Sequence, residues 1–144
     1  MSVIFSRQCE YALQAVMYLA LKPEEEMTSI RELTMKLHTP YFFMAKILQD
    51  LVYKGLLKSH KGPSGGFTLA LPAKKITLHH IIEAVDGNDL TQGCILGFPE
   101  CSSTAQCALH DQWSNFRDNI FKALLNKTIE EMSINMRKPQ YHLQ

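Results

Sequence analysis

Apolar residues recur at helical spacing between Arg7 and Leu21. Spacings of three and four residues place apolar side chains on one face of a helix, where they can be buried together. The stretch contains no proline, and the next one along the chain is Pro23. The pattern therefore predicts an amphipathic helix with one buried face. That face would consist of Tyr11, Ala12, Ala15, Val16 and Leu19.

Two shorter helices are predicted next. Ser29 followed by Glu32 fits a capping box, in which a hydroxyl and a carboxylate bind the free amides at a helix start. That helix should run to about Leu37. The second helix should have Thr39 as its N-cap and Pro40 at its first helical position, where the missing N–H costs nothing.

The second of these helices should end at Gly55, because glycine readily adopts the positive φ of a helix C-terminus. Two helices joined by a turn at His38 and Thr39 form a helix-turn-helix. The buried face of the second helix would contain Phe43, Ile47, Leu48 and Leu51.

A β-hairpin is expected directly after the helix-turn-helix. Residues 56–60 and 67–71 are apolar strand formers on either side of the Gly/Pro-rich turn at 61–66. Such a hairpin is the wing of a winged helix. Thr77 should cap a further helix that ends at Gly87. Its buried face would be Leu78, Ile81, Ile82 and Val85.

Residues 88–106 show no clear helical or strand period, and long irregular loops in compact domains are usually functional. A long helix with an apolar seam follows. A lone winged helix has little need for it, so we expect a two-fold partner to cover the seam. The alternative is that the seam packs on its own domain. It comprises Leu109, Trp113, Phe116, Ile120 and Leu124.

These elements predict a mainly α fold with a small β-hairpin, namely a winged helix-turn-helix plus a long C-terminal dimerisation helix. We expect a DNA-binding domain over 1–87 and a cysteine-bearing sensor loop over 88–107. A dimerisation helix region over 108–134 and a tail over 135–144 would complete the chain. The length of 144 residues suits one ordinary core with one added element.

The formal net charge of +1 conceals a segregation of basic residues. The segment between Met27 and Ile76 contains eight basic and two acidic residues. Its formal charge is therefore +6, and that of the remainder is −5. A surface that faces phosphates has this asymmetry.

No apolar run reaches the roughly 20 residues of a membrane span and no signal peptide begins the chain, so we expect a cytoplasmic protein.

DNA contacts are expected from the recognition helix and from the wing. Residues at the N-terminus of a recognition helix come closest to base edges, and a glycine-rich wing lets its backbone approach a phosphate. Of the aromatic residues at this helix start, we expect Tyr41 to point outward and Phe43 inward. The predicted contact residues are Thr39, Pro40, Tyr41, Lys46, Lys58, His60, Lys61, Ser64, Gly65 and Gly66. For Gly65 and Gly66, a purely structural role in the hairpin is the alternative.

Cys94, Cys101 and Cys107 lie in the irregular segment, and His110 follows closely. In a reducing compartment such clustered cysteines are metal ligands or redox sensors, and a flexible loop can wrap an iron–sulfur cluster. The alternatives are a thiol switch, a structural zinc site without the usual close cysteine pair, and a Cys/His hydrolase with no evident cleft. We expect no enzyme. Cys9 should be structural.

The chain resembles the bacterial family of winged-helix regulators that includes the iron–sulfur regulator IscR and the nitric-oxide sensor NsrR. The matching stretches are Ser6–Leu21, Pro40–Gly55, Gly62–Phe67, Cys107–Trp113 and Leu125–Ile129. This resemblance implies a homodimer crossed by the long helix, palindromic operator DNA and a cluster held by the three loop cysteines. The gap between the first two cysteines is one residue longer here than is usual in the family.

The resemblance leaves two candidates for a fourth cluster ligand. IscR-like members use the histidine at the position of His110 with a [2Fe–2S] cluster. NsrR-like members use a carboxylate from the partner's first helix with a [4Fe–4S] cluster, and here Glu10 precedes Tyr11. The match around His110 favours the [2Fe–2S] cluster. A protein prepared in air can lack the cluster, whichever of the two types it binds.

The resulting expectation is a DNA-binding transcriptional repressor that senses iron–sulfur, nitric oxide or redox status. Two other functions remain open at this stage. One is a cluster-free thiol/disulfide regulator of the same fold, and the other is a winged helix that serves only protein interaction.

Overall fold

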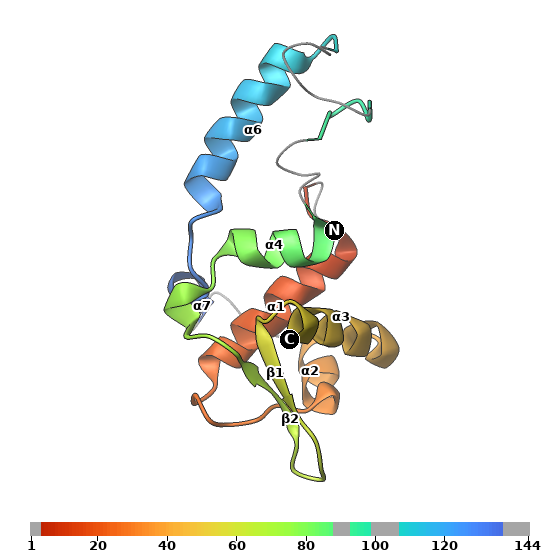
Figure 1. The fold of residues 1–144 in the computed structure, drawn as a ribbon, viewed down its shortest axis with the longest axis vertical. Helices are drawn as coiled ribbons and strands as arrows, with labels where there is room; N and C mark the ends of the chain where they lie inside the picture. Colours follow the sequence, from red (N-terminus) through yellow and green to blue (C-terminus); the bar gives the residue numbers. More distant parts are fainter. Residues whose placement is uncertain (1–3, 88–92, 99–106, 137–144) are drawn as a thin grey trace.

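The structure is a computed structural model that describes residues 4–87, 93–98 and 107–136. A helical body carries a β-hairpin at one end, and the long helix α6 (His110–Leu124) projects from the other end as an arm (Figure 1). The predicted mainly α winged-helix fold is confirmed. None of the helices in the described ranges is long and apolar enough to cross a membrane.

Helix α1 (Arg7–Leu21) forms the centre of the body. It starts at Ser6, whose hydroxyl accepts a hydrogen bond from the Cys9 amide at 3.0 Å. The predicted apolar face is buried against the neighbouring helices, with Tyr11 only half-buried. The buried residues are Cys9, Ala12, Ala15, Val16 and Leu19.

Helix α2 (Ile30–Leu37) begins with half of the predicted capping box. The Ser29 hydroxyl accepts from the Glu32 amide at 3.1 Å, as expected. The Glu32 carboxylate, however, accepts from Lys22 Nζ at 3.1 Å. A cation from the end of α1 therefore takes the carboxylate that would otherwise bind the helix start.

Helix α3 (Tyr41–Tyr53) has Pro40 as its N-cap, so the prediction of Thr39 as the cap is wrong. The Thr39 amide instead donates to the Thr34 carbonyl at 3.2 Å and closes the end of α2, after His38 has adopted φ 51°. Thr39 therefore belongs to the turn, and its side chain is buried.

The end of α3 matches the prediction. Gly55 has φ 81°, its amide donates to the Val52 carbonyl at 3.0 Å, and the Leu56 amide donates to Leu51 at 2.9 Å. This pair of bonds is a Schellman motif. The buried residues of the helix are Met44, Ile47, Leu48 and Leu51. Phe43, which was expected to be buried, is half-buried and packs against the edge of the core. Met44 beside it is the residue that is fully buried.

Strands β1 (Leu57–His60) and β2 (Gly66–Leu69) form the antiparallel wing, with Leu57 opposite Leu69. Thr28, just before α2, bonds to Phe67 through both backbone groups at 3.1 and 2.8 Å. This isolated bridge fixes the wing against the helix-turn-helix. It was not predicted, because the two residues are far apart in the sequence.

The short 3-10 helix η1 (Ala73–Lys75) leads into α4 (Leu78–Asp86). Thr77 caps α4 as predicted, and the His80 ring completes a capping box by accepting from the Thr77 amide at 3.1 Å. Gly87 ends the helix with φ 73°. Of the predicted buried face, Leu78, Ile81 and Ile82 are buried and Val85 is half-buried.

The expected helical region 108–134 is divided between α6 and a second helix, α7 (Ile129–Met136). The Thr128 hydroxyl accepts from the Glu131 amide at 3.2 Å and so starts a new helix. Helix α7 packs on α1, where Ile129 is fully buried. The connection before it is fixed to α4, because the Leu78 amide donates to the Lys127 carbonyl at 2.9 Å.

Candidate functional site

The start of α3 presents two aromatic rings to solvent. Tyr41 is 50% exposed and Phe42 is 86% exposed, and their rings meet edge to face at 5.6 Å. Phe43 turns inward and packs edge-on against Tyr11 at 5.5 Å. The predicted directions of Tyr41 and Phe43 therefore agree with the structure. The predicted DNA contacts did not include Phe42, because neighbouring aromatic residues compete for the core.

Three further residues were predicted to contact DNA from α3 and the turn before it. Pro40 and Lys46 are exposed, so both are accessible to a partner. Thr39 differs from the expectation, because its hydroxyl is buried and has no hydrogen-bond partner in the described structure. Burial directs that hydroxyl away from the surface on which a phosphate would lie.

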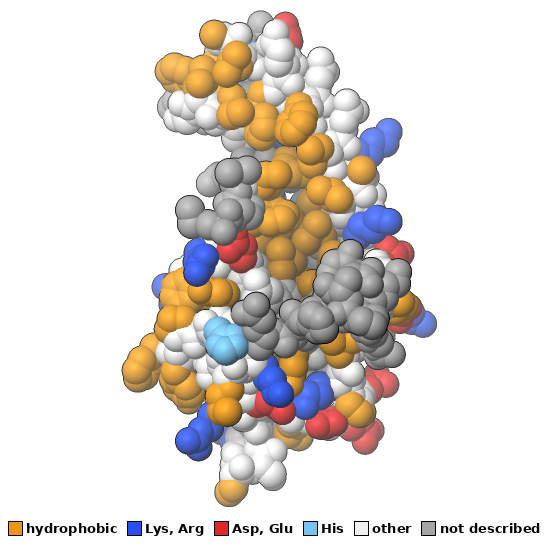
Figure 2. Space-filling view, turned by 180° about the vertical axis from the view of Figure 1, so that it is seen from behind, with side chains coloured by type: hydrophobic (Ala, Val, Ile, Leu, Met, Phe, Trp, Pro, Cys, Tyr) orange, Lys and Arg blue, Asp and Glu red, His pale blue; other side chains and the backbone are white. Residues whose placement is uncertain are grey.

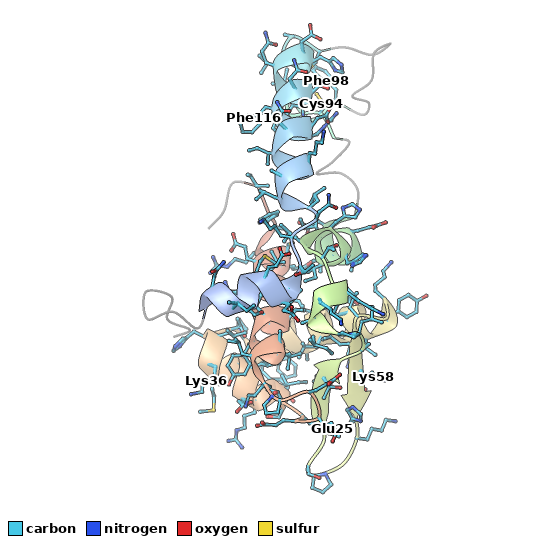
Figure 3. All side chains as sticks on the ribbon, turned by 90° about the vertical axis from the view of Figure 1, so that its left-hand side faces the viewer. Glu25, Lys36, Lys58, Cys94, Phe98 and Phe116 are labelled. Atoms are coloured by element: carbon cyan, nitrogen blue, oxygen red, sulfur yellow. The ribbon has the colours of Figure 1, made fainter. Side chains whose placement is uncertain are left out.

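The wing displays charged and polar side chains along the hairpin. Lys58, Lys61 and Ser64 are exposed, and Figure 3 shows Lys58 beside the hairpin. His60 is half-buried, with its ring Nε2 3.3 Å from the Thr68 hydroxyl. The exposed lysines of the wing and Lys46 of α3 supply positive charge near the helix-turn-helix, which suits a phosphate backbone.

Two wing glycines are packed too closely to carry a side chain. A Cβ atom at Gly65 would lie 2.1 Å from the His60 carbonyl oxygen, and one at Gly66 would lie 2.6 Å from that of Thr28. Both residues are half-buried. A structural role, the alternative considered for them from the sequence, is therefore evident in their packing.

Two of the three loop cysteines come together beside α6. The Cys94 and Cys107 Sγ atoms lie 3.5 Å apart, within hydrogen-bonding distance, and both residues are half-buried. Figure 3 shows Cys94 beside α6. Two thiolates bound to one tetrahedral metal ion, with bonds of about 2.3 Å, lie about 3.8 Å apart. The pair is thus spaced suitably for a shared metal or cluster. Cys101 lies outside the described residues.

The pKa of the Cys94 thiol is lowered from its ordinary value. Its partial burial acts in the opposite direction and raises the pKa. This effect is outweighed by hydrogen bonds that the Cys94 thiolate accepts, from the backbone of Phe98, Leu96 and Gly97 and from the Cys107 side chain. These bonds favour the thiolate, which is the form that binds metal ions.

The two candidates for a fourth ligand have different surroundings. His110 is the first residue of α6, and its amide donates to the Cys107 carbonyl at 3.1 Å. Glu10 lies in the first turn of α1, 3.9 Å from the Arg7 guanidinium. Within the described ranges, no three residues of metal-ligand type gather in one place. His110 is therefore not brought together with both cysteines.

The cysteine loop is attached to α6 through the carbonyl of Gly93. Trp113 Nε1 donates to that oxygen at 2.9 Å, and Arg117 Nη1 donates to it at 3.3 Å. Gly93 directly precedes Cys94. Sequence reasoning assigned Trp113 to an apolar seam and did not consider Arg117, because nothing local indicates a partner more than twenty residues away.

The apolar seam of α6 remains largely uncovered. Leu109, Phe116 and Leu124 are 43%, 53% and 41% exposed, and only Arg117 and Phe121 of this helix are buried. Figure 2 shows hydrophobic side chains gathered along the arm and down onto the body. Three of the five seam residues are therefore exposed in the described structure, whereas Trp113 and Ile120 are half-buried.

Comparison with known proteins identifies the family. The family model described as "Rrf2: Iron-dependent Transcriptional regulator" matches residues 5–135. The chain belongs to the Rrf2 family. A relative from Aquifex aeolicus, described as an HTH-type transcriptional regulator, is 33% identical over 90% of this chain and 91% of its own.

Solved Rrf2-like structures share the fold. CymR, the global cysteine regulator of B. subtilis, superimposes with a TM-score of 0.75 at 24% identity, over 93% of this chain and 98% of its own. T. potens IscR gives a TM-score of 0.74 at 22% identity, over 100% and 93%.

Family membership settles the class of function. The protein is a DNA-binding transcriptional regulator of the Rrf2 family and not an enzyme. Neither a hydrolase nor a winged helix that serves only protein interaction fits this family. The family includes iron–sulfur regulators such as IscR.

Proposed function

We propose that this Rrf2 protein is a homodimeric repressor that senses iron–sulfur, nitric oxide or redox status through a cluster held by Cys94, Cys101 and Cys107. The observation that carries this proposal is the 3.5 Å approach of Cys94 and Cys107 at the start of α6. A change in what these sulfur atoms bind would act directly on the helix that we assign to the dimer.

The DNA interface is formed by α3 and the wing. Helix α3 would enter the major groove, where Tyr41 and Lys46 reach bases or phosphates and Pro40 lies at the helix start. The wing would follow the adjacent backbone, with phosphate contacts from Lys58, His60, Lys61 and Ser64. The side-chain-free backbone at Gly65 and Gly66 would help close approach. We assign Thr39 to supporting the turn, since its hydroxyl is buried.

The dimer would form through α6. Its exposed apolar seam is what a second copy of the helix would cover, and isologous contact would place two α3 helices about a two-fold axis. A dimer of this kind recognises a palindromic operator whose half-sites lie about one turn of DNA apart. We assign α7 to the DNA-binding body, because it packs on α1.

The cluster would be held by thiolates of the three loop cysteines. Among the fourth ligands we favour His110 with a [2Fe–2S] cluster, and Glu10 of the partner subunit with a [4Fe–4S] cluster is the alternative. A bound cluster would supply a redox-active iron site that oxidants and nitric oxide can attack. The residues of this chain would hold the loop against α6, and losing the cluster would change how its cysteine sulfur atoms are held relative to one another.

The test is anaerobic purification followed by a visible spectrum and assays for iron and acid-labile sulfide. We expect a coloured protein whose iron is lost in Cys94→Ser and Cys107→Ser and is retained in Cys9→Ala, since Cys9 is buried elsewhere. A colourless wild-type protein that takes up no iron or sulfide on reconstitution contradicts the cluster.

A metal-free thiol switch is the second candidate, and the same sulfur–sulfur approach favours it. The two thiols would form a disulfide and pass two protons and two electrons to hydrogen peroxide, which is reduced to two molecules of water. Peptide mapping under non-reducing conditions tests for the Cys94–Cys107 bond. Iron-free protein that forms this bond and changes its DNA affinity would support the switch over the cluster.

A further inference from the structure

Two side chains of α6 converge on one backbone oxygen in the cysteine loop. Trp113 Nε1 and Arg117 Nη1 lie 2.9 and 3.3 Å from the Gly93 carbonyl. Residues four apart share a helix face, so both donors approach from the same side. The loop is therefore attached to α6 immediately before Cys94.

Burial of Arg117 is unusual for an exposed arm. The residue is 8% exposed, whereas its ion-pair neighbour Asp118, 3.4 Å away, has a side chain that is 69% exposed. A buried guanidinium requires hydrogen-bond acceptors, because its desolvation is costly. The Gly93 carbonyl is one such acceptor. This contact links the charge on α6 to the loop.

The two cysteines reach α6 by different routes. Cys107 is joined to it through the chain, and its carbonyl accepts from the first helical amide, that of His110, at 3.1 Å. Cys94 is joined to it through the neighbouring Gly93 carbonyl, in addition to its own sulfur contact with Cys107. A change in the Cys94–Cys107 separation would therefore act on the loop directly beside its attachment to Trp113 and Arg117.

We propose that Trp113 and Arg117 are positioning residues that hold Cys94 against Cys107 and transmit a change in bonding at Cys94 to α6. The transmission to α6 rests on the proposed sensor function, whereas the positioning does not. The single tryptophan makes the arrangement measurable, because all indole fluorescence of the chain comes from Trp113.

The first test measures how fast iodoacetamide alkylates each cysteine in reduced, metal-free, full-length protein, resolved by peptide mass spectrometry. Trp113→Phe keeps a ring but removes the N–H donor, and Arg117→Met removes the guanidinium. We expect each variant to raise the Cys94 rate about fivefold, the factor that corresponds to one hydrogen bond. Arg117→Lys, which keeps a cationic donor, should restore much of the protection.

Two controls accompany this test. Gln112→Ala changes an exposed neighbour on α6 and should leave the Cys94 rate unaltered. Cys9 is fully buried, so its alkylation reports unfolding within the same molecule. Unchanged Cys94 rates in Trp113→Phe and Arg117→Met, with Cys9 still protected, overturn the proposal.

A second test leaves Trp113 and Arg117 unsubstituted. Trp113 emission is followed while Cys94 of the wild-type protein is alkylated, with Cys94→Ser treated in parallel. We expect a change of emission in the wild type and none in the variant, whereas identical traces overturn the proposal. Neither test uses iron, so the positioning role can hold in a protein without a cluster and can fail in one that has a cluster.

Discussion

Gly66 lies so close to Thr28 that a Cβ atom at position 66 would stand 2.6 Å from the Thr28 carbonyl oxygen. That oxygen accepts the Phe67 amide at 2.8 Å, so the contact is part of the bridge between the wing and the helix-turn-helix. Two functional elements distant in sequence are thereby fixed relative to each other.

Gly66→Ala should separate this bridge and lower the free energy of unfolding by about 2 kcal/mol, the scale of an overpacked site. Thermal and urea unfolding of the purified variant measure the effect. Ser64→Ala, at an exposed position of the same hairpin, should remain within about 0.5 kcal/mol of the wild type. Equal unfolding midpoints for Gly66→Ala and the wild type would contradict this prediction, because they would mean that the backbone at Thr28 moves aside without a loss of stability.

Lys61→Ala should weaken DNA binding and make its salt dependence shallower. One lost phosphate contact reduces the slope of log K against log salt by about 0.9. Binding titrations over a series of salt concentrations provide the slope. The matched control is Lys122→Ala, an exposed lysine on the α6 arm. An unchanged affinity and slope for Lys61→Ala would remove the tip of the wing from the interface.

Phe116→Glu should prevent dimer formation, because it places a charge in the exposed apolar seam of α6. Sedimentation at micromolar concentration should give the monomer mass for this variant and the dimer mass for the wild type. Asn115→Glu adds the same charge on another face of the helix and should leave the dimer intact. A dimeric Phe116→Glu protein would argue against this interface.

The titration of Cys9 should lower the free energy of unfolding as the pH is raised. Burial, followed by the negative charge of Asp86, raises the pKa of its thiol from 9.0 to about 12. The unfolded chain therefore loses this proton at a lower pH than the folded one, and stability falls as pH rises from about 9 towards 12.

Urea unfolding at pH 8 and pH 10.5 tests this effect against Cys9→Ala. Between these two values the wild type should lose about 2 kcal/mol more than the variant, because the variant lacks the titrating thiol. Parallel losses in the two proteins would mean that the Cys9 thiol has no unusual pKa.

Much of the fold follows from local signals in the sequence. Ser29, Thr77 and Gly55 act within one helical turn, so their capping and stop roles could be predicted without knowledge of distant partners. Helix α7 carries the same kind of signal at Thr128 and Glu131, which could have been recognised.

The remaining features depend on contacts between distant residues. Burial of Thr39 follows from the way α2 ends, and Lys22 from α1 removes Glu32 from its expected partner. In the site, the sequence placed Cys94 and Cys107 in one segment, and the structure brings their sulfur atoms to 3.5 Å. The Arg117 contact with Gly93 has no local pattern from which to infer it.

The most direct test of the account compares DNA affinity before and after the cluster is removed from the same protein. Operator duplexes are first selected from a random library, and Kd is then measured anaerobically for cluster-loaded protein and for protein treated with a nitric-oxide donor. We predict that Kd changes by about tenfold or more, which is a typical size of coupling between two sites. The Cys107→Ser variant should show no such change. Equal affinities of the two wild-type forms, within about twofold, would contradict the claim that the cysteine loop controls DNA binding.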